Sequence, residues 1–387
     1  MSRMKRSCPV CSSTEGGHRI HVNEFATLDG LDMSYHLARC GVCGFHFASE
    51  LPAETEYLRY YRSLSKYDSQ PTVSPLDRQR INAAVDFLAH AGLGKEARIL
   101  DLGCGFGALL AALRDHGWSN LQGVDPAPQS AQRAFEQFGL ACITQGALSD
   151  IADREELAST DLVCLMAVLE HLPELRRDLA RLLAQLKPGA RVLIEVPALD
   201  LFEPEAGEPF GELSLEHIQF FSLQSLCNLL AGLGAQVEHH HLLRLPSLQS
   251  GSLFVLAALE GQPSGLEPED PSRMDAYLAG SAHRWGSAIA RVPSQPFVLY
   301  GAGSHSARLL PQLERNRAGS PVAVLDGNIN LHGKDFGGLT VQAPNALAQY
   351  PGMPVLISSF RSEQAIARSL RSRFSNPLVL MYADYAA

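Results

Sequence analysis

The sequence predicts an α/β protein in which a small cysteine-bounded unit precedes two regions of βαβ type. Three observations support this prediction. Two Cys-x-x-Cys pairs lie within the first 43 residues, and two later stretches each alternate short apolar strands with helices. Gly- and Pro-rich breaks separate these strands and helices, as is typical of parallel sheets. At 387 residues the chain is long enough for two or three domains of about 150 residues.

The composition argues against two classes of partner. A formal net charge of −9 disfavours non-specific nucleic-acid binding, which requires a basic surface, and disfavours a polybasic membrane anchor. The longest apolar stretch, residues 162–169, is far shorter than the about 20 residues that span a bilayer. The N-terminal sequence MSRMKRSCPV lacks the apolar run of a secretory signal. We therefore expect a cytoplasmic protein that binds neither nucleic acid nor membrane.

Four of the eight cysteines form two Cys-x-x-Cys pairs near the N-terminus. In a reducing compartment such pairs indicate a metal rather than disulfides. Four thiolates complete a tetrahedral zinc site and leave no position open for a catalytic water, so the predicted zinc is structural. The alternative is four buried cysteines without a ligand. The expected zinc ligands are Cys8, Cys11, Cys40 and Cys43, and the first domain is expected to be residues 1–75, including a tyrosine-rich connector.

Residues 76–260 are expected to form the second domain. Apolar residues at helical spacing begin near residue 76, and strands and helices then alternate. Two further strands are expected late in this region, the first of which carries His239, His240 and His241. Neighbouring side chains on a strand point to opposite faces, so these three cannot bind one metal, and a surface strand is expected. The earlier elements are strands at 97–102, 120–126, from 161, and 191–197, and a helix at 129–138.

A Gly-rich turn, Asp101-Leu-Gly-Cys-Gly-Phe-Gly107, directly follows the strand at 97–102 and precedes a helix. Glycines allow a tight turn close to a ligand, and the helix N-terminus favours negative charge. Asp125 ends the next strand 24 residues later, where a carboxylate can accept both hydroxyls of a ribose. The alternative is a structural turn in an inactive nucleotide-binding fold.

Together with Gly123-Val-Asp125 and Leu186-Lys-Pro-Gly-Ala190, this turn resembles the class I S-adenosylmethionine-dependent methyltransferases. The resemblance implies a Rossmann-like central domain and S-adenosyl-L-methionine as cofactor. It implies that the glycines cradle the amino-acid part of the cofactor, that Asp125 holds the ribose, and that the adenine packs after the third strand. The implied cofactor-binding residues are Asp101, Gly103, Cys104, Gly105, Asp125, Ala147 and Leu148.

Two Glu-His pairs are candidates for acid–base chemistry. Glu216-His217 lies in SLEHIQFFS, about 20 residues after the strand at 191–197, where this fold places substrate-facing loops. Glu170-His171 closes the strand that begins at 161, where structural and functional interpretations are equally open. Both carboxylate and imidazole are residue types used for proton transfer.

Residues 261–387 are expected to form a linker, a helix and a C-terminal domain. Gly301-Ala-Gly303 follows an apolar strand, and Asp326 ends the next strand, a pattern that on its own suggests a dinucleotide site. The preferred interpretation is a Rossmann-like wall of an acceptor cleft, in which His305 is a candidate to contact an acceptor phosphate.

The four-cysteine unit, the EHxxFFS segment and the C-terminal domain together resemble the three-domain deoxysugar C-methyltransferases. This resemblance implies C-methylation of a nucleotide-linked keto sugar, with His217 as base, Glu216 beside it, and a tyrosine from the connector near the substrate. Ser214 stands where those enzymes usually carry a tyrosine. The alternative is O- or N-methylation of a sugar or another biosynthetic metabolite that is not linked to a nucleotide. The connector tyrosines are Tyr57, Tyr60, Tyr61 and Tyr67, and the sequence leaves the oligomeric state open.

Overall fold

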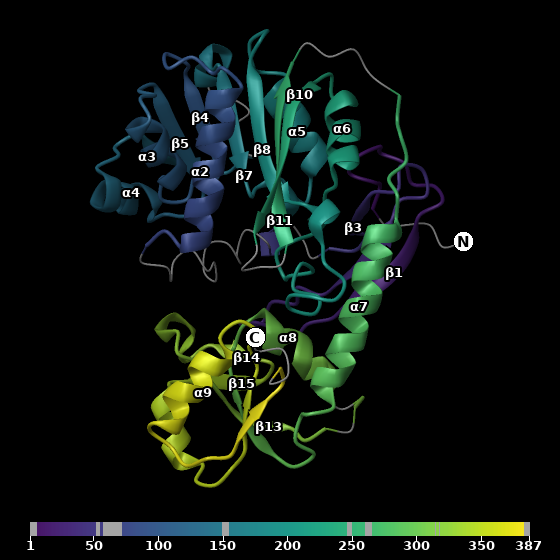
Figure 1. The fold of residues 1–387 in the computed structure, drawn as a ribbon, viewed down its shortest axis with the longest axis vertical. Helices are drawn as coiled ribbons and strands as arrows, with labels where there is room; N and C mark the ends of the chain where they lie inside the picture. The colour runs from purple at the N-terminus through teal and green to yellow at the C-terminus, as the bar shows by residue number, and fades with distance from the viewer. Residues whose placement is uncertain are drawn as a thin grey trace. The chain divides into compact units, whose positions relative to one another are not determined.

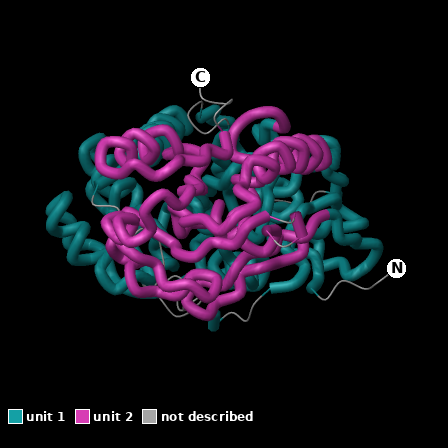
Figure 2. The backbone as a smooth tube through the Cα atoms, turned by 90° about the horizontal axis from the view of Figure 1, so that it is seen from below, with its two compact units in different colours: residues 1–20, 37–203, 217–274 teal, residues 21–36, 204–216, 275–387 magenta. Residues whose placement is uncertain are grey.

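A computed structural model describes the chain in two compact units, each built from three separate segments (Figure 2). Unit 1 comprises residues 1–20, 37–203 and 217–274, and unit 2 comprises residues 21–36, 204–216 and 275–387. The predicted boundaries at 75 and 260 stay predictions. The described residues are 6–51, 55–56, 72–148, 155–245, 250–259, 265–313, 315–316 and 318–382.

Unit 1 is organised around a seven-stranded sheet of order β10-β11-β8-β7-β4-β5-β6. The five strands from β8 to β6 are parallel, and the hairpin of β10 and β11 joins β8 in antiparallel fashion. The predicted parallel sheet is therefore confirmed. The strands are β4 (Ile99–Leu102), β5 (Leu121–Asp125), β6 (Ile143–Gln145), β7 (Leu162–Met166), β8 (Arg191–Pro197), β10 (Gln236–Leu245) and β11 (Ser250–Ala258).

Helices cover both faces of this sheet because its strands are apolar on both sides (Figure 1). In β8, Leu193 packs with α2 and α3, whereas Ile194 packs with α5 and α6 on the opposite face. Ser74 caps the N-terminus of α2, and its side chain accepts a hydrogen bond from the N–H of Asp77. The helices are α2 (Pro75–His90), α3 (Ala108–Asp115), α4 (Ser130–Phe138), α5 (Leu175–Leu183) and α6 (Leu223–Ala231), with 3₁₀ turns η3 (Glu155–Ser159), η4 (Leu169–His171) and η5 (Leu199–Leu201).

The N-terminal cysteine region contributes short strands to a separate four-stranded sheet. β3 pairs antiparallel with β2 on one side and with β9 on the other. Because β9 follows Ile218 directly, this pairing fixes the chain just after His217. The strands are β1 (His18–Asn23), β2 (Tyr35–Arg39), β3 (His46–Ala48) and β9 (Gln219–Phe220), in the order β1-β2-β3-β9.

Unit 2 contains a second, mostly parallel sheet of order β14-β15-β13-β12-β16-β17. Only β14 runs antiparallel to its neighbour, and α9 packs its apolar face on the sheet. The strands are β12 (Phe297–Tyr300), β13 (Pro321–Leu325), β14 (Asp335–Phe336), β15 (Leu339–Gln342), β16 (Val355–Ile357) and β17 (Leu378–Leu380); the helices are α7 (Ser272–Ile289), α8 (Ser304–Leu309), η6 (Leu310–Gln312), η7 (Ile329–Leu331), η8 (Pro344–Gln349) and α9 (Glu363–Arg371).

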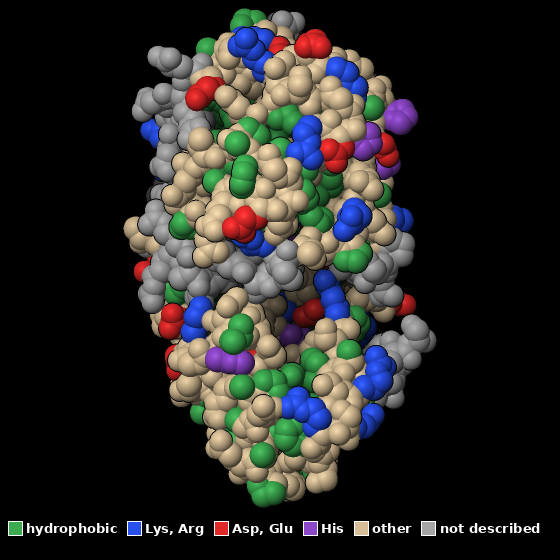
Figure 3. All heavy atoms as spheres, turned by 90° about the vertical axis from the view of Figure 1, so that its left-hand side faces the viewer, with side chains coloured by type: hydrophobic (Ala, Val, Ile, Leu, Met, Phe, Trp, Pro, Cys, Tyr) green, Lys and Arg blue, Asp and Glu red, His purple; other side chains and the backbone are tan. Residues whose placement is uncertain are grey.

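Among the described residues, no helix combines the length and apolar character needed to cross a bilayer. On the face drawn in Figure 3, lysine and arginine side chains are scattered and interspersed with acidic ones. The described part of this face therefore presents no extended basic patch of the kind that binds nucleic acid.

Candidate functional site

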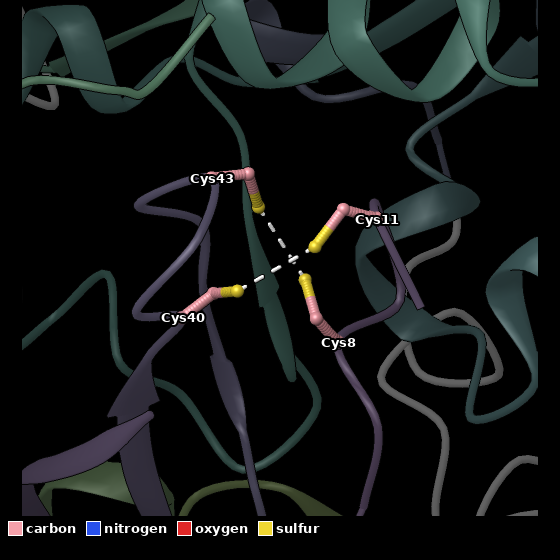
Figure 4. A group of neighbouring side chains, drawn as sticks. All are labelled: Cys8, Cys11, Cys40 and Cys43. Atoms are coloured by element: carbon pink, nitrogen blue, oxygen red, sulfur yellow. Dashed lines mark hydrogen bonds between the residues drawn. The ribbon is translucent and has the colours of Figure 1, made fainter. Parts of the chain in front are cut away.

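The four N-terminal cysteines converge on one point in unit 1 (Figure 4). The sulfur atoms of Cys8 and Cys43 are 3.5 Å apart, and those of Cys11 and Cys40 are 3.6 Å apart. A zinc ion with Zn–S bonds of about 2.3 Å has tetrahedral S···S edges of about 3.8 Å. The backbone N–H of Val42 points at the Cys40 sulfur at 3.4 Å, as expected when a thiolate is held in a tight turn. These four residues therefore fit a zinc ion.

The cysteine cluster shares its core with the central sheet. Phe45 and Phe47 are fully buried and pack in the same apolar cluster as Leu169 and Ile194. Arg176 on α5 donates a hydrogen bond to the Val10 carbonyl, inside the first cysteine turn. The cluster is thus not a separate module within unit 1, because its removal would expose apolar surface of the sheet.

The Gly-rich turn leads from β4 into α3. Gly103 has φ +77°, and a side chain there would lie 2.7 Å from a methyl carbon of Val168. Gly105 has φ +53°, and a Cβ at this position would meet nothing within 4 Å. The turn therefore needs glycine at both positions for its backbone conformation, and it leaves space at Gly105 for a ligand.

Asp125 ends β5 and closes the same turn. One carboxylate oxygen accepts a hydrogen bond from the N–H of Gly105 at 2.7 Å, and the other accepts from the N–H of Ala127 at 2.9 Å and from Ser130 Oγ at 2.7 Å. Each carboxylate oxygen has two lone pairs. The oxygen bonded to Gly105 therefore retains an acceptor site for a hydroxyl group, as the sequence predicts for a ribose.

Asp101 lies on β4 just before the turn and is 2% exposed. Its Oδ1 has no hydrogen-bond partner among the described residues. Burial, reinforced by the nearby Asp125 carboxylate, raises the pKa of Asp101 to about 8. Burial together with Asp101 and Asp125 also raises the pKa of the Cys104 thiol. A cationic ligand in this turn would relieve the cost of ionising Asp101.

The loop after β6 reaches the same edge of the sheet. The N–H of Gly146 donates to the backbone carbonyl of Asp125 at 3.0 Å. This bond holds the start of the loop beside the residue that is predicted to bind the ribose, and Ala147 and Leu148 are the next residues along the chain. Leu148 is half-buried and packs against the main apolar cluster of unit 1. The structure thus brings the turn, Asp125 and this loop to one edge, where parallel α/β sheets bind ligands.

His171 and His217 are brought together at this edge, with ring centroids 5.0 Å apart. His171 Nε2 lies 3.8 Å from a carboxylate oxygen of Glu170, which is 1% exposed. Both residues belong to η4, which follows Val168, the residue that touches Gly103. The sequence singles out these Glu-His pairs but does not indicate that the two histidines meet.

Glu216 is 8% exposed, and its N–H donates to Ser214 Oγ at 3.3 Å. It is the last residue of a unit 2 segment, and His217 begins the next segment of unit 1. The connector tyrosines Tyr57, Tyr60, Tyr61 and Tyr67 lie outside the described residues.

Comparison with known proteins adds a family to this geometry. Residues 76–240, from α2 into β10, match the family described as methyltransferase domain. The chain contains a methyltransferase domain.

Curated proteins similar to this segment carry the names of different methyltransferases. The C-methyltransferase NovU of Streptomyces niveus is 30% identical over 185 residues, which are 46% of this chain and 42% of that protein. The trans-aconitate 2-methyltransferase of Azoarcus sp. (strain BH72) is 32% identical over 124 residues, which are 31% of this chain and 46% of that protein. The chain therefore spans less than half the length of these curated relatives.

A solved structure with a similar fold is the 1,6-didemethyltoxoflavin-N1-methyltransferase of Burkholderia thailandensis, with bound 1,6-didemethyltoxoflavin and S-adenosylhomocysteine. It is 22% identical, has a TM-score of 0.43, and covers 56% of this chain and 96% of its own.

Two side-chain contacts of unit 1 were not predicted from the sequence. Arg80 on α2 donates through Nε at 2.9 Å and through a second nitrogen to the Glu195 carboxylate, which is fully buried on β8. The single acidic residue in the apolar strand RVLIEVP could have indicated this pair, because a buried carboxylate requires a partner. Ser130, the hydroxyl donor to Asp125, has no signal of its own.

In unit 2, the imidazole of His305 is held by two hydroxyl groups of the fold. Its ring nitrogens lie 2.7 Å from Ser358 Oγ and 2.6 Å from the Tyr382 hydroxyl, so both are engaged within the fold. Burial, together with the charge of Arg308, lowers the pKa of His305 to about 3. A neutral imidazole that is hydrogen-bonded on both sides does not favour His305 as the candidate contact for an acceptor phosphate. The predicted surface strand is confirmed, because His239, His240 and His241 lie exposed on β10.

Proposed function

We propose that this protein transfers the methyl group of S-adenosyl-L-methionine to a small-molecule acceptor and that the four-cysteine cluster holds a structural zinc ion. The observation that supports this most strongly is the turn between β4 and α3. Gly105 leaves open space, and the N–H of Gly105 and the Asp125 carboxylate are hydrogen-bonded to each other beside it. This turn lies inside the segment that matches the methyltransferase family.

The residues at this edge would hold the cofactor by complementary chemistry. Gly103 and Gly105 let the backbone approach its amino-acid part, and the spare acceptor site on Asp125 suits a ribose hydroxyl. Asp101 is a buried carboxylate that a cationic amine would stabilise. The half-buried loop of Ala147 and Leu148 would cover the adenine. When bound, the cofactor supplies a methyl group already activated by its sulfonium.

For the acceptor, we propose a carbon next to the ketone of a nucleotide-linked sugar, with His217 as the base. The C–H bond at that carbon breaks, its proton moves to a ring nitrogen of His217, and its electron pair moves to the carbonyl oxygen to give an enolate. The enolate carbon would then form the new bond to the methyl group while the methyl–sulfur bond breaks, its electron pair stays on sulfur, and S-adenosylhomocysteine leaves. Glu216 orients the imidazole or binds an acceptor hydroxyl. His171, whose ring lies 5.0 Å from that of His217, borders the same space.

The second candidate is O- or N-methylation of a metabolite without a nucleotide. Ser214, where the sugar enzymes usually carry tyrosine, favours this alternative. Deuterium exchange separates the two candidates, because only C-methylation requires loss of a proton from the acceptor carbon.

The first experiment is a calorimetric titration of dTDP, UDP, GDP and CDP into protein saturated with S-adenosylhomocysteine. Micromolar binding of one nucleotide supports the nucleotide-sugar acceptor and identifies its base. If the protein binds S-adenosylhomocysteine but none of these nucleotides, the proposal of methyl transfer stands and the proposal of a nucleotide-linked acceptor is contradicted. Once an acceptor is known, His217→Asn is compared with His240→Asn, an exposed histidine on β10. Near-wild-type turnover of His217→Asn would contradict its role as base.

A further inference from the structure

Apart from the four cysteines, one other group among the described residues brings three metal-ligating atoms together. Glu170, His171 and His217 each offer one ligand atom, and these atoms all lie within 4.8 Å of one another. Two imidazoles and one carboxylate are a ligand set that binds first-row transition metals with positions left open. The group belongs entirely to unit 1.

The spacing of Glu170 and His171 leaves room for an ion. His171 Nε2 and Glu170 Oε1 are 3.8 Å apart, which is longer than a hydrogen bond. Two ligands that each lie about 2.1 Å from one ion can be up to about 4.2 Å apart. The 3.8 Å separation is therefore one that a shared metal ion can span, and a direct hydrogen bond does not account for it.

Backbone hydrogen bonds hold the two ligand segments together although they are far apart in sequence. The N–H of Ile218, next to His217, donates to the Glu170 carbonyl at 2.9 Å. Gln219 Nε2 donates to the Leu172 carbonyl at 2.9 Å, one residue beyond His171. The ligands are thus fixed by the fold before any ion binds, which lowers the entropic cost of forming the site.

Burial and charge favour a cation here. Glu170 is 1% exposed, and its carboxylate attracts a cation more strongly in these buried surroundings than it would in water. The side chain of His171 retains 14% exposure, so an ion has access from solvent. Imidazole ligands favour Zn²⁺, Co²⁺ or Ni²⁺, whereas Mg²⁺ prefers oxygen ligands and keeps its waters.

We propose that Glu170, His171 and His217 form a second, divalent transition-metal site, distinct from the four-cysteine cluster. A bound metal occupies a lone pair of His217, so the ion and the substrate proton compete for the same imidazole. Metal binding therefore inhibits the enzyme, a consequence that rests on the proposed role of His217 as base.

The test uses the 387-residue chain, whose cysteine cluster has been loaded with one zinc. Zn²⁺ is titrated by calorimetry, and the metal bound per chain is counted by elemental analysis after gel filtration. We expect one additional zinc per chain and no comparable binding of Mg²⁺. Loss of a hydrogen-bond partner of a metal ligand lowers metal affinity by about 10- to 100-fold. Loss of a ligand itself should lower the affinity for the second zinc by more than this. The variants are His171→Ala, His217→Ala and Glu170→Gln, with His240→Ala on β10 as the matched control.

Each outcome decides the inference. A second zinc that is lost in the ligand variants but retained in His240→Ala supports it. No second zinc, or one that the ligand variants retain, overturns it. S-adenosylhomocysteine binding is measured on every variant to show that it is folded. Wild-type protein that binds this product but no second zinc contradicts the metal site alone, whereas protein that binds the zinc but not the product contradicts the proposed function alone.

Discussion

Replacing a proposed zinc ligand should destabilise the methyltransferase sheet itself. The reason is that the cysteine turns carry Val10, Phe45 and Phe47, which are at most 1% exposed and pack in the core of unit 1. Burial of one such side chain contributes about 1.5–3 kcal/mol. If Cys40→Ser releases this region, the loss is at least about 5 kcal/mol, comparable with the about 5–15 kcal/mol stability of a whole domain.

For a unit of this size, 1 kcal/mol corresponds to about 2–4 °C in Tm. A loss of about 5 kcal/mol therefore predicts that the Tm of unit 1 falls by about 10–20 °C in Cys40→Ser. The chain has two tryptophans, and each reports one unit: Trp118 is buried in unit 1 and Trp285 in unit 2. Thermal unfolding is followed by fluorescence in a Trp285→Phe background, where only Trp118 reports.

The matched control is Cys227→Ser, which alters a half-buried cysteine of α6 outside the cluster. We expect its Tm to change little. Elemental analysis must show that Cys40→Ser has lost its zinc. An unchanged Trp118 transition in zinc-free protein would refute the argument that the cysteine region and the sheet share one core.

Three further outcomes are expected. Gly105→Ala and Gly139→Ala both place a Cβ in open space at positive φ, so each should cost about 1–2 kcal/mol. Only Gly105→Ala should weaken S-adenosylhomocysteine binding in calorimetry, and equal binding by both variants would contradict the site. Asp125→Asn removes an acceptor for one of three donors, which should lower the free energy of unfolding by about 1–3 kcal/mol in chemical denaturation. It should also weaken S-adenosylhomocysteine binding, and unchanged binding would argue against a ribose contact. The pKa of His305 is lowered from 6.5 to about 3, so the unfolded chain binds a proton that the fold excludes. The free energy of unfolding of unit 2 should therefore fall by up to about 5 kcal/mol as pH falls from 6.5 to 3. Unfolding is followed by the fluorescence of Trp285, and His305→Asn should abolish this contribution.

Local periodicity was sufficient to predict the elements that frame the site. The apolar run RVLIEVP is β8, and the helix predicted near residue 76 is α2, whose first residue is Pro75. These predictions succeed because burial on both faces of a parallel sheet leaves a continuous apolar run, and because an amphipathic helix leaves a 3.6-residue period. The Gly-rich turn was also visible in the sequence, because its positive φ angles require glycine.

Long-range contacts were not visible in the same way. His171 and His217 meet because Ile218 bonds to the Glu170 carbonyl and because β9 joins β3 of the cysteine region. No local spacing encodes such a pairing, since it depends on where the chain returns in space. The composition of each unit from three separate segments has the same origin: residues 21–36 belong to unit 2, although they lie between the two cysteine pairs, which belong to unit 1.

The two sheets also show why an acid after a Gly-rich turn is weak evidence for a ligand. Asp326 of unit 2 accepts hydrogen bonds from the N–H groups of Ala302 and Asn328, both at 2.7 Å, in the same manner as Asp125 accepts from Gly105 and Ala127. These bonds close the turn between the first two strands, so they are part of the fold whether or not a ligand binds. In unit 2, His305 is hydrogen-bonded to both Ser358 and Tyr382 at the ends of the strands, and a Cβ on Gly303 would meet nothing within 4 Å, as at Gly105. In unit 1, the space at Gly105 stays open beside a buried Asp101 whose Oδ1 has no partner among the described residues. The unsatisfied carboxylate of Asp101, rather than the shared motif or the open space at a glycine, therefore favours unit 1 as the cofactor-binding unit.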